Sequence, residues 1–177
     1  MKLSFHVIPI IFLGFLAGCY STSDYLGDGQ LIDNGIFESK DRYVLKLGDI
    51  DFNKHGNYDY NIIGLPPDEE FIVGFELTSE KKIDIFSTLP NNAEIFVRLT
   101  ENQEKILFEV RSKLNNWVWN TGSLEPNRAF IYVGGENSSY FNSNTVKKYK
   151  LTISILQPNT IAIPTKAKLL AKSGGWK

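Results

Sequence analysis

From Tyr43 onward, the chain alternates apolar and polar residues with a period of two over most of its length. The clearest run is Phe71, Val73, Phe75 and Leu77. Successive side chains of a β-strand point to opposite faces, so this pattern predicts strands with one apolar face. The other segments with the same pattern are 43–52, 58–62, 83–85, 95–99, 106–110, 117–119, 130–132, 149–155 and 161–171.

Turn-forming residues separate these segments at short intervals. Asn, Gly and Pro fill the gaps, as in 65–68 (LPPD) and 89–92 (LPNN), and Gly48-Asp49 shifts the parity of its segment as a β-bulge does. Many short strands with no amphipathic helix predict an all-β fold, an antiparallel β-sandwich of about eight to ten strands. Pro164 places the last strand at an edge or a bulge. We predict one domain over residues 43–177, because no composition break indicates a second.

The N-terminus has the pattern of an export signal. Lys2 precedes an apolar run at 7–16, which the small residues Ala17 and Gly18 and then Cys19 follow. A membrane-spanning helix would need about 20 apolar residues, and this run is shorter and contains Pro9. We therefore predict a signal peptide over residues 1–18.

The residues 16–19 (LAGC) resemble the lipobox of bacterial lipoproteins. The resemblance implies that the Cys19 thiol carries diacylglycerol, that cleavage occurs before it, and that the new amine carries an N-acyl chain. No other cofactor is expected. Three acyl chains on one residue are enough for stable membrane anchoring. A buried free cysteine is the alternative interpretation, and the position of Cys19 beside the signal argues against it. Cys19 is the only cysteine, so the exported body cannot form an internal disulfide.

In double-membraned bacteria, the resemblance implies sorting by the residue after the cysteine. Tyr20 stands there instead of Asp, which favours the outer membrane with the domain facing the periplasm, or the cell membrane if the host has one membrane. Residues 19–42 are expected to form a lipidated tether with one short docking element within 31–37. About 20 extended residues would reach roughly 65 Å.

Charge is divided unevenly along the chain. No acidic residue follows Glu136, whereas seven lysines do; residues 19–136 carry 20 acidic and 11 basic side chains. If the last two long strands are neighbours in one sheet, their lysines form a basic patch, with Lys148, Lys150, Lys166 and Lys168 as candidate binding residues for anionic lipid or an acidic partner. Alternatively, these lysines protect a solvated face and acidic strands lie across from them. Export argues against a nucleic-acid partner.

Aromatic side chains are a second candidate binding feature. Trp117 and Trp119 share one face of their segment, and the Asn- and Ser-rich loop 134–144 contains Tyr140 and Phe141. If exposed, these rings beside amides would form a sugar-binding platform. The alternative is that both tryptophans pack in the core. Trp176 near the C-terminus is a candidate docking plug.

The mature chain has few residues for catalysis. His55 is its only histidine and lies in a polar turn, and we find no nucleophile-elbow, metalloprotease or metal-cluster motif. Residues 49–53 (DIDFN) begin like a calcium loop, but Lys54 stands where the turn requires Gly. Carboxylates suited to glycan hydrolysis remain, with no way to choose a pair: Asp49, Asp51, Asp59, Asp68, Glu69 and Glu70.

These observations favour a non-enzymatic, lipid-anchored lipoprotein whose β-sandwich binds a protein or an envelope polymer. The alternative hypothesis is an immunity or inhibitor lipoprotein against a toxin that acts in the periplasm. A carboxylate-dependent glycan enzyme is the third hypothesis.

Overall fold

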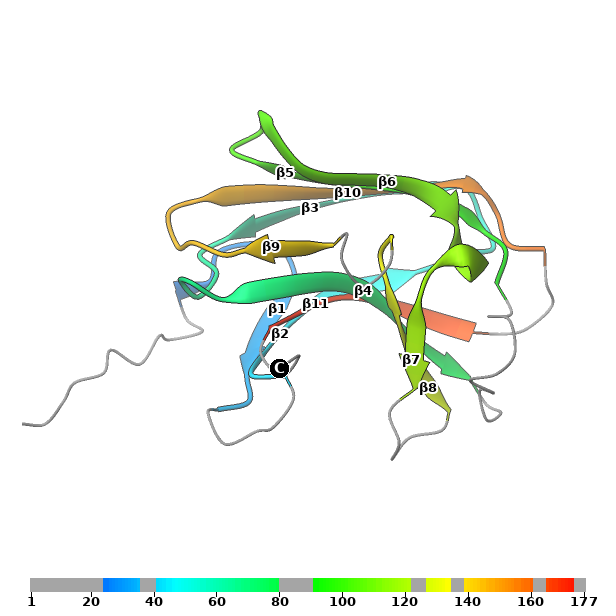
Figure 1. The fold of residues 1–177 in the computed structure, drawn as a ribbon, viewed down its shortest axis with the longest axis horizontal. Helices are drawn as coiled ribbons and strands as arrows, with labels where there is room; N and C mark the ends of the chain where they lie inside the picture. The colour runs from blue at the N-terminus through cyan, green and yellow to red at the C-terminus, as the bar shows by residue number, and fades with distance from the viewer. Residues whose placement is uncertain are drawn as a thin grey trace, which may run out of the picture.

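The computed structural model describes residues 24–35, 41–79, 91–121, 127–134, 139–160 and 165–173; the side chains of 79, 119–121 and 165–166 lie outside this description. Cys19, Trp176 and the predicted segments 83–85 and 161–163 also fall outside it. The prediction of an all-β sandwich is confirmed, because two antiparallel sheets lie face to face (Figure 1). None of the helices among these residues is long and apolar enough to cross a bilayer.

The larger sheet has seven strands. Its order is β1 (Gln30–Asp33), β2 (Tyr43–Ile50), β11 (Thr165–Ser173), β4 (Glu70–Ser79), β8 (Arg128–Tyr132) and β7 (Trp119–Thr121), and β9 (Tyr140–Asn142) also pairs with β4. The smaller sheet has the order β3 (Gly56–Ile63), β10 (Lys148–Gln157), β5 (Glu94–Glu101) and β6 (Lys105–Lys113). A short 3-10 helix, η2 (Leu114–Asn116), follows β6.

The core lies between the inner faces of the two sheets. Phe75 and Leu169 from the larger sheet and Leu151 and Val97 from the smaller one have no exposed surface. These residues occupy alternate positions in their strands, as the sequence pattern predicts. Their burial supplies the main stabilisation of a chain that has no internal disulfide.

The parity shift in β2 is a β-bulge, as predicted. Opposite β11, Gly48 pairs with Leu169 and Lys46 pairs with Leu170, so Leu47 is the extra residue. The shift lets Leu45, Leu47 and Ile50 all contribute to the core.

The last strand is not at an edge, which corrects the expectation based on Pro164. β11 lies between β2 and β4 and pairs with both along its length. Within the described residues the ladder with β4 runs from Thr165 to Ser173, and Pro164 lies outside them.

The domain begins earlier than residue 43, because residues 25–33 are part of the sandwich. Leu26 N–H and Asp28 N–H donate to the carbonyl oxygens of Ile63 and Asn61 on β3. The chain then turns at Gly29, which has a φ of 85°, and β1 pairs with β2 in the other sheet. Residues 25–33 therefore connect the two sheets, and β1 overlaps the docking element expected within 31–37.

A second apolar cluster lies on the outer face of the larger sheet. It comprises Ile72, Phe130, Tyr132 and Leu170, each at most 8% exposed. Gly74 makes room for it, because a Cβ there would overlap the ring of Phe130. The larger sheet thus carries buried apolar residues on both faces.

Candidate functional site

The predicted aromatic platform does not form. Trp117 is 5% exposed and stacks on Phe75, with ring centroids 6.1 Å apart. Phe141 is also 5% exposed and stacks on Phe71 at 5.9 Å, and Tyr140 is half-buried against the outer apolar cluster. Trp119 lies in β7, with its side chain outside the described part. Core packing therefore accounts for Trp117 and Phe141.

The predicted lysine patch is not one surface. Lys148 and Lys150 lie on β10 of the smaller sheet, whereas Lys166 and Lys168 lie on β11 of the larger sheet. Lys148, Lys150 and Lys168 are exposed; the Lys166 side chain is outside the described part. Because β10 and β11 are not neighbours, the charge asymmetry of the sequence does not become a basic face.

Acidic residues lie across from two of these lysines, Lys150 and Lys168, in line with the alternative interpretation. Lys150 Nζ is 3.5 Å from Asp59 Oδ1 on β3. Lys168 pairs in register with Asp49 on one side and Glu76 on the other. Lys150 and Lys168 are therefore placed to balance acids within their own sheets, whereas Lys148 pairs with Ile63 and Lys166 with Thr78.

The outer face of the smaller sheet is a row of ion pairs. Arg98 on β5 contacts Glu109 on β6 at 2.5 Å, and Arg111 contacts Glu94 at 2.7 Å. All four side chains keep some contact with solvent. Exposed pairs of this kind contribute at most about 1 kcal/mol each. They give this face a polar surface with little net charge.

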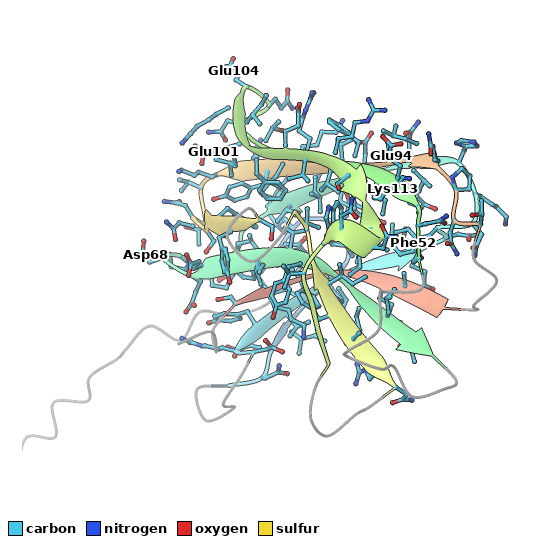
Figure 2. The ribbon with its side chains drawn as sticks, turned by 45° about the vertical axis from the view of Figure 1, so that its right-hand side comes forward. Phe52, Asp68, Glu94, Glu101, Glu104 and Lys113 are labelled. Atoms are coloured by element: carbon cyan, nitrogen blue, oxygen red, sulfur yellow. The ribbon has the colours of Figure 1, made fainter. Side chains whose placement is uncertain are left out.

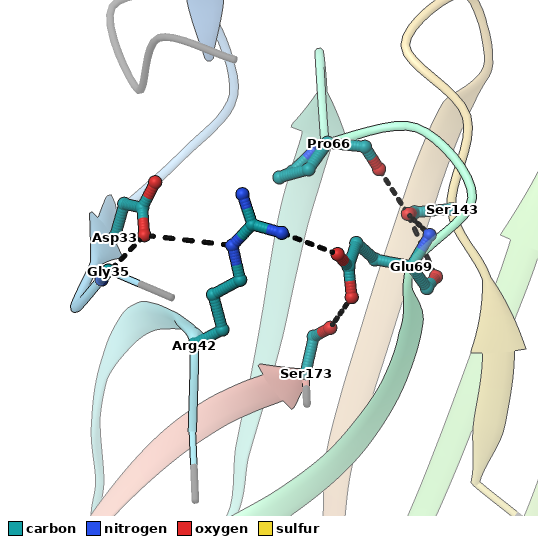
Figure 3. Close-up of polar contacts among 7 residues, drawn as sticks. All are labelled: Asp33, Gly35, Arg42, Pro66, Glu69, Ser143 and Ser173. Atoms are coloured by element: carbon teal, nitrogen blue, oxygen red, sulfur yellow. Dashed lines mark hydrogen bonds and ion pairs between the residues drawn. The ribbon is translucent and has the colours of Figure 1, made fainter. Parts of the chain in front are cut away.

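Arg42 joins the ends of strands that are distant in sequence (Figure 3). Its Nη1 is 3.4 Å from Oε1 of Glu69, and Oε2 of Glu69 accepts a hydrogen bond of 2.8 Å from the Ser173 hydroxyl. Its Nε is 4.0 Å from Oδ1 of Asp33, and this buried Nε makes no hydrogen bond within the described structure. The cluster fixes the ends of β1, β2, β4 and β11 together.

Ser143 extends this polar cluster to the segment that connects β9 of the larger sheet with β10 of the smaller sheet (Figure 3). Its hydroxyl donates to the carbonyl oxygen of Pro66 and accepts from the N–H of Glu69. Backbone hydrogen bonds join Ser143 to Asp68 and Glu69 as well. The loop before β4 is thereby attached to the segment between β9 and β10.

Side-chain amides connect the loops at the other end of the sandwich. Asn92 N–H donates to Oδ1 of Asn159 at 3.1 Å, and the Asn159 amide donates to Oδ1 of Asn53 at 3.2 Å. Asn92 and Thr160 exchange two further hydrogen bonds, and Asn91 is 1% exposed.

We call the loops 51–55, 91–93 and 158–160 the far end. Phe52 and Glu94 mark this end in Figure 2, and Asp68, Glu101 and Glu104 mark the opposite one.

The described residues do not bring together a catalytic set. His55 lies at the far end, where its Nδ1–H donates to the Ile155 carbonyl oxygen at 3.3 Å. Ser173 lies at the opposite end of β11, beside Glu69, so the two cannot form a serine–histidine pair. Among these residues no group of three or more His, Cys, Asp or Glu is placed to hold a metal ion. The carboxylates of Asp51, Asp59 and Glu69 are held by separate partners: Lys54 at 3.2 Å, Thr152 at 2.6 Å and Ser173 at 2.8 Å.

Among the described residues, four side chains have clearly shifted pKa values. A hydrogen bond from the Asn53 N–H is the largest cause that lowers the pKa of Asp51, and Lys54 adds to it. Burial raises the pKa of Tyr43, Tyr60 and Tyr149. These shifts have local structural causes and do not converge on one site.

Comparisons of the chain with family models, with curated proteins and with solved structures give no match. The sequence reasoning missed Arg42, Ser143 and Ser173 as members of one cluster. Their only sequence signal is that Arg42 and Ser173 flank strand segments, because their contacts depend on which strands become neighbours.

Proposed function

We propose that this chain is a lipid-anchored outer-membrane lipoprotein whose β-sandwich binds a protein or an envelope component and catalyses no reaction. The observation that supports the proposal best is the attachment of residues 25–33 to both sheets. Cys19 is five residues ahead of Asp24, so the linker spans at most about 18 Å. A lipid on Cys19 would therefore hold the domain beside the bilayer, much closer than a 65 Å tether would.

With so short a linker, one end of the sandwich would lie beside the membrane and the other would face away from it. Asp24 lies beside Gly64, since a Cβ at Gly64 would overlap the Asp24 carbonyl oxygen. The chain thus enters where β3 ends, and we call this the anchor end. The far end, on the opposite side, would face away from the membrane.

The far end offers groups that suit a polar partner. Asn53, Lys54, His55 and Thr160 are exposed there. The buried amide contacts of Asn159 hold two of these loops in place. The exposed amide, hydroxyl and ammonium groups can hydrogen-bond a peptide backbone or a glycan, and loops already held in place lower the entropic cost of binding. We therefore place the partner at the far end.

The anchor is tested by changing Cys19→Ala in the producing bacterium. We expect loss of metabolic labelling with a fatty acid and loss of flotation with membranes. A Ser23→Ala variant, which leaves the lipobox intact, is the matched control. Labelling of the Cys19→Ala protein at the control level would contradict the proposal.

The partner site is tested by photocrosslinking in living cells. A benzoylphenylalanine at His55 should give a discrete, saturable adduct, and the same group at Lys105, near the anchor end, should not. Treatment of the adduct with protease or with muramidase distinguishes a protein partner from the cell-wall polymer. Equal crosslinking at both positions, or none at His55 in membrane-bound protein, would remove the far end as the binding site.

A further inference from the structure

Exposed apolar side chains gather at the anchor end of the smaller sheet. Among the described residues the large hydrophobic side chains with high exposure are Leu26 at 77%, Val146 at 82%, Ile106 at 53% and Val118 at 45%. Single exposed apolar residues are ordinary on protein surfaces. Here, three of these four lie near the point where the chain enters the sandwich.

Strand register places the three residues along the same end of the smaller sheet. The Leu26 N–H donates to the carbonyl oxygen of Ile63 on β3. Ile63 pairs with Lys148 on β10, and Val146 is two residues before Lys148. At about 4.8 Å per strand, this puts the Leu26 and Lys148 backbones roughly 10 Å apart. Ile106 pairs with Thr100, which pairs with Lys150, so it lies two strands beyond β10, on the side away from Leu26. The three residues therefore form a row across this end of the sheet, about 19 Å long from Leu26 to Ile106.

Val118 provides an internal contrast. It follows η2, after the end of β6 that is remote from the 101–105 hairpin. Its position on the molecule is therefore away from the anchor end, and it serves as a control of similar size and type.

Charge at the anchor end is mixed. Lys148 and Lys105 are exposed there, and so are Glu104 and Asp68 (Figure 2). Glu101 is already paired with Lys147 at 2.9 Å. A surface with both signs of charge gains little from anionic lipid head groups, so any membrane contact here depends on the apolar side chains.

We propose that Leu26, Val146 and Ile106 form a membrane-contacting edge that inserts into the bilayer interface beside the lipidated cysteine. This inference rests on the proposed lipid anchor, because an 18 Å linker brings this end of the sandwich to the surface. Apolar side chains that are exposed to water are stabilised when they move into that interface, because apolar surface is removed from water. The domain then stands on the membrane in one orientation, with the far end pointing outward.

The test uses the full-length lipidated protein, purified from membranes and reconstituted in phosphatidylcholine vesicles. Leu26→Cys, Val146→Cys and Val118→Cys variants are labelled with the fluorophore NBD, and the unsubstituted protein measures any labelling of Cys19. We expect emission at shorter wavelength, and several-fold stronger quenching by nitroxide-labelled acyl chains, at positions 26 and 146 but not at 118. Adding anionic phosphatidylglycerol should leave this difference unchanged.

A second variant tests whether the apolar side chains cause the contact. An NBD label at Ile106→Cys should lose its lipid quenching in a Leu26→Ser/Val146→Ser background, while flotation with vesicles persists. Equal, water-like emission at 26, 146 and 118 in protein that floats would overturn the membrane-contacting edge and leave the lipid anchor standing. Failure of the unsubstituted protein to float would overturn both.

Discussion

The indole of Trp117 lies nearly parallel to the ring of Phe75, with an interplanar angle of 11°. Phe75 belongs to β4, in the middle of the larger sheet, and Trp117 follows η2 at the end of the smaller sheet's last strand. The pair therefore closes the core where the chain passes from one sheet to the other.

Trp117→Ala should destabilise the domain by about 3–5 kcal/mol, because it removes a buried aromatic side chain and leaves a cavity. Trp117→Phe keeps a ring against Phe75 and should cost less. Urea unfolding followed by circular dichroism measures both values. Val118→Ala is the exposed control and should change stability by no more than about 0.5 kcal/mol. Equal effects at 117 and 118 would contradict the core position of Trp117.

Gly29→Ala should weaken the attachment of residues 25–33. Gly29 and Gly35 have nearly equal positive φ values, 85° and 87°, but a Cβ at Gly29 would overlap the Lys46 carbonyl oxygen, whereas nothing lies within 4 Å of one at Gly35. We expect about 1 kcal/mol of destabilisation for Gly35→Ala and about 1–3 kcal/mol more for Gly29→Ala. Hydrogen exchange should accelerate at the amides of Leu26 and Asp28 in Gly29→Ala only. Matching exchange in the two variants would refute the steric explanation.

Lys147→Met should destabilise the protein more than Lys150→Met. The Glu101 side chain that Lys147 contacts is 11% exposed, whereas Asp59 beside Lys150 is 54% exposed. Losing Lys147 leaves a carboxylate in a poorly solvated site, at a cost of about 2–3 kcal/mol. Losing Lys150 should cost less than about 1 kcal/mol. A double-mutant cycle with Glu101→Gln measures the coupling, and zero coupling would contradict the prediction.

Stability should fall as pH rises above about 10, where unfolded tyrosines ionise. Burial raises the pKa of Tyr60 and Tyr149 in the folded state, so the folded chain retains protons that the unfolded chain releases. The stabilisation is complete below the unfolded pKa and is lost as pH rises through the folded pKa. Urea midpoints between pH 8 and 11 check this. The Tyr149→Phe variant should show a shallower decline, and an unchanged slope would count against its contribution.

The strands could be predicted from the sequence because their cause is local. Phe71, Val73, Phe75 and Leu77 alternate because they form the face of β4 that packs between the two sheets, and the parity shift at Gly48 reflects the bulge that keeps Ile50 in the core. Trp117 and Trp119 show the limit of this pattern. Their spacing favoured one strand, but Trp117 is the residue that caps the C-terminal end of η2, and β7 begins only at Trp119.

Contacts between distant segments could not be predicted, since one sequence does not show which strands become neighbours. The basic patch required β10 and β11 to adjoin, and they belong to different sheets. Arg42, Glu69 and Ser173 meet because β2, β4 and β11 lie together with their ends aligned. The pairing of residues 25–33 could not be predicted for a related reason. Their mixed composition resembles a tether, yet their backbone pairs with strands whose position only the fold determines.

The path of residues 25–33 also sets how the domain bears mechanical load. Residues 26 and 28 hydrogen-bond to β3 as they run inward from the anchor end. If the proposed lipid anchor at Cys19 is present, tension on it would pull along this segment and load its hydrogen bonds together, in shear. Because the next strand pairs with the other sheet, the same pull is shared by both halves of the sandwich. The N-terminal segment would then pass that force to both sheets, through β3 and through β2.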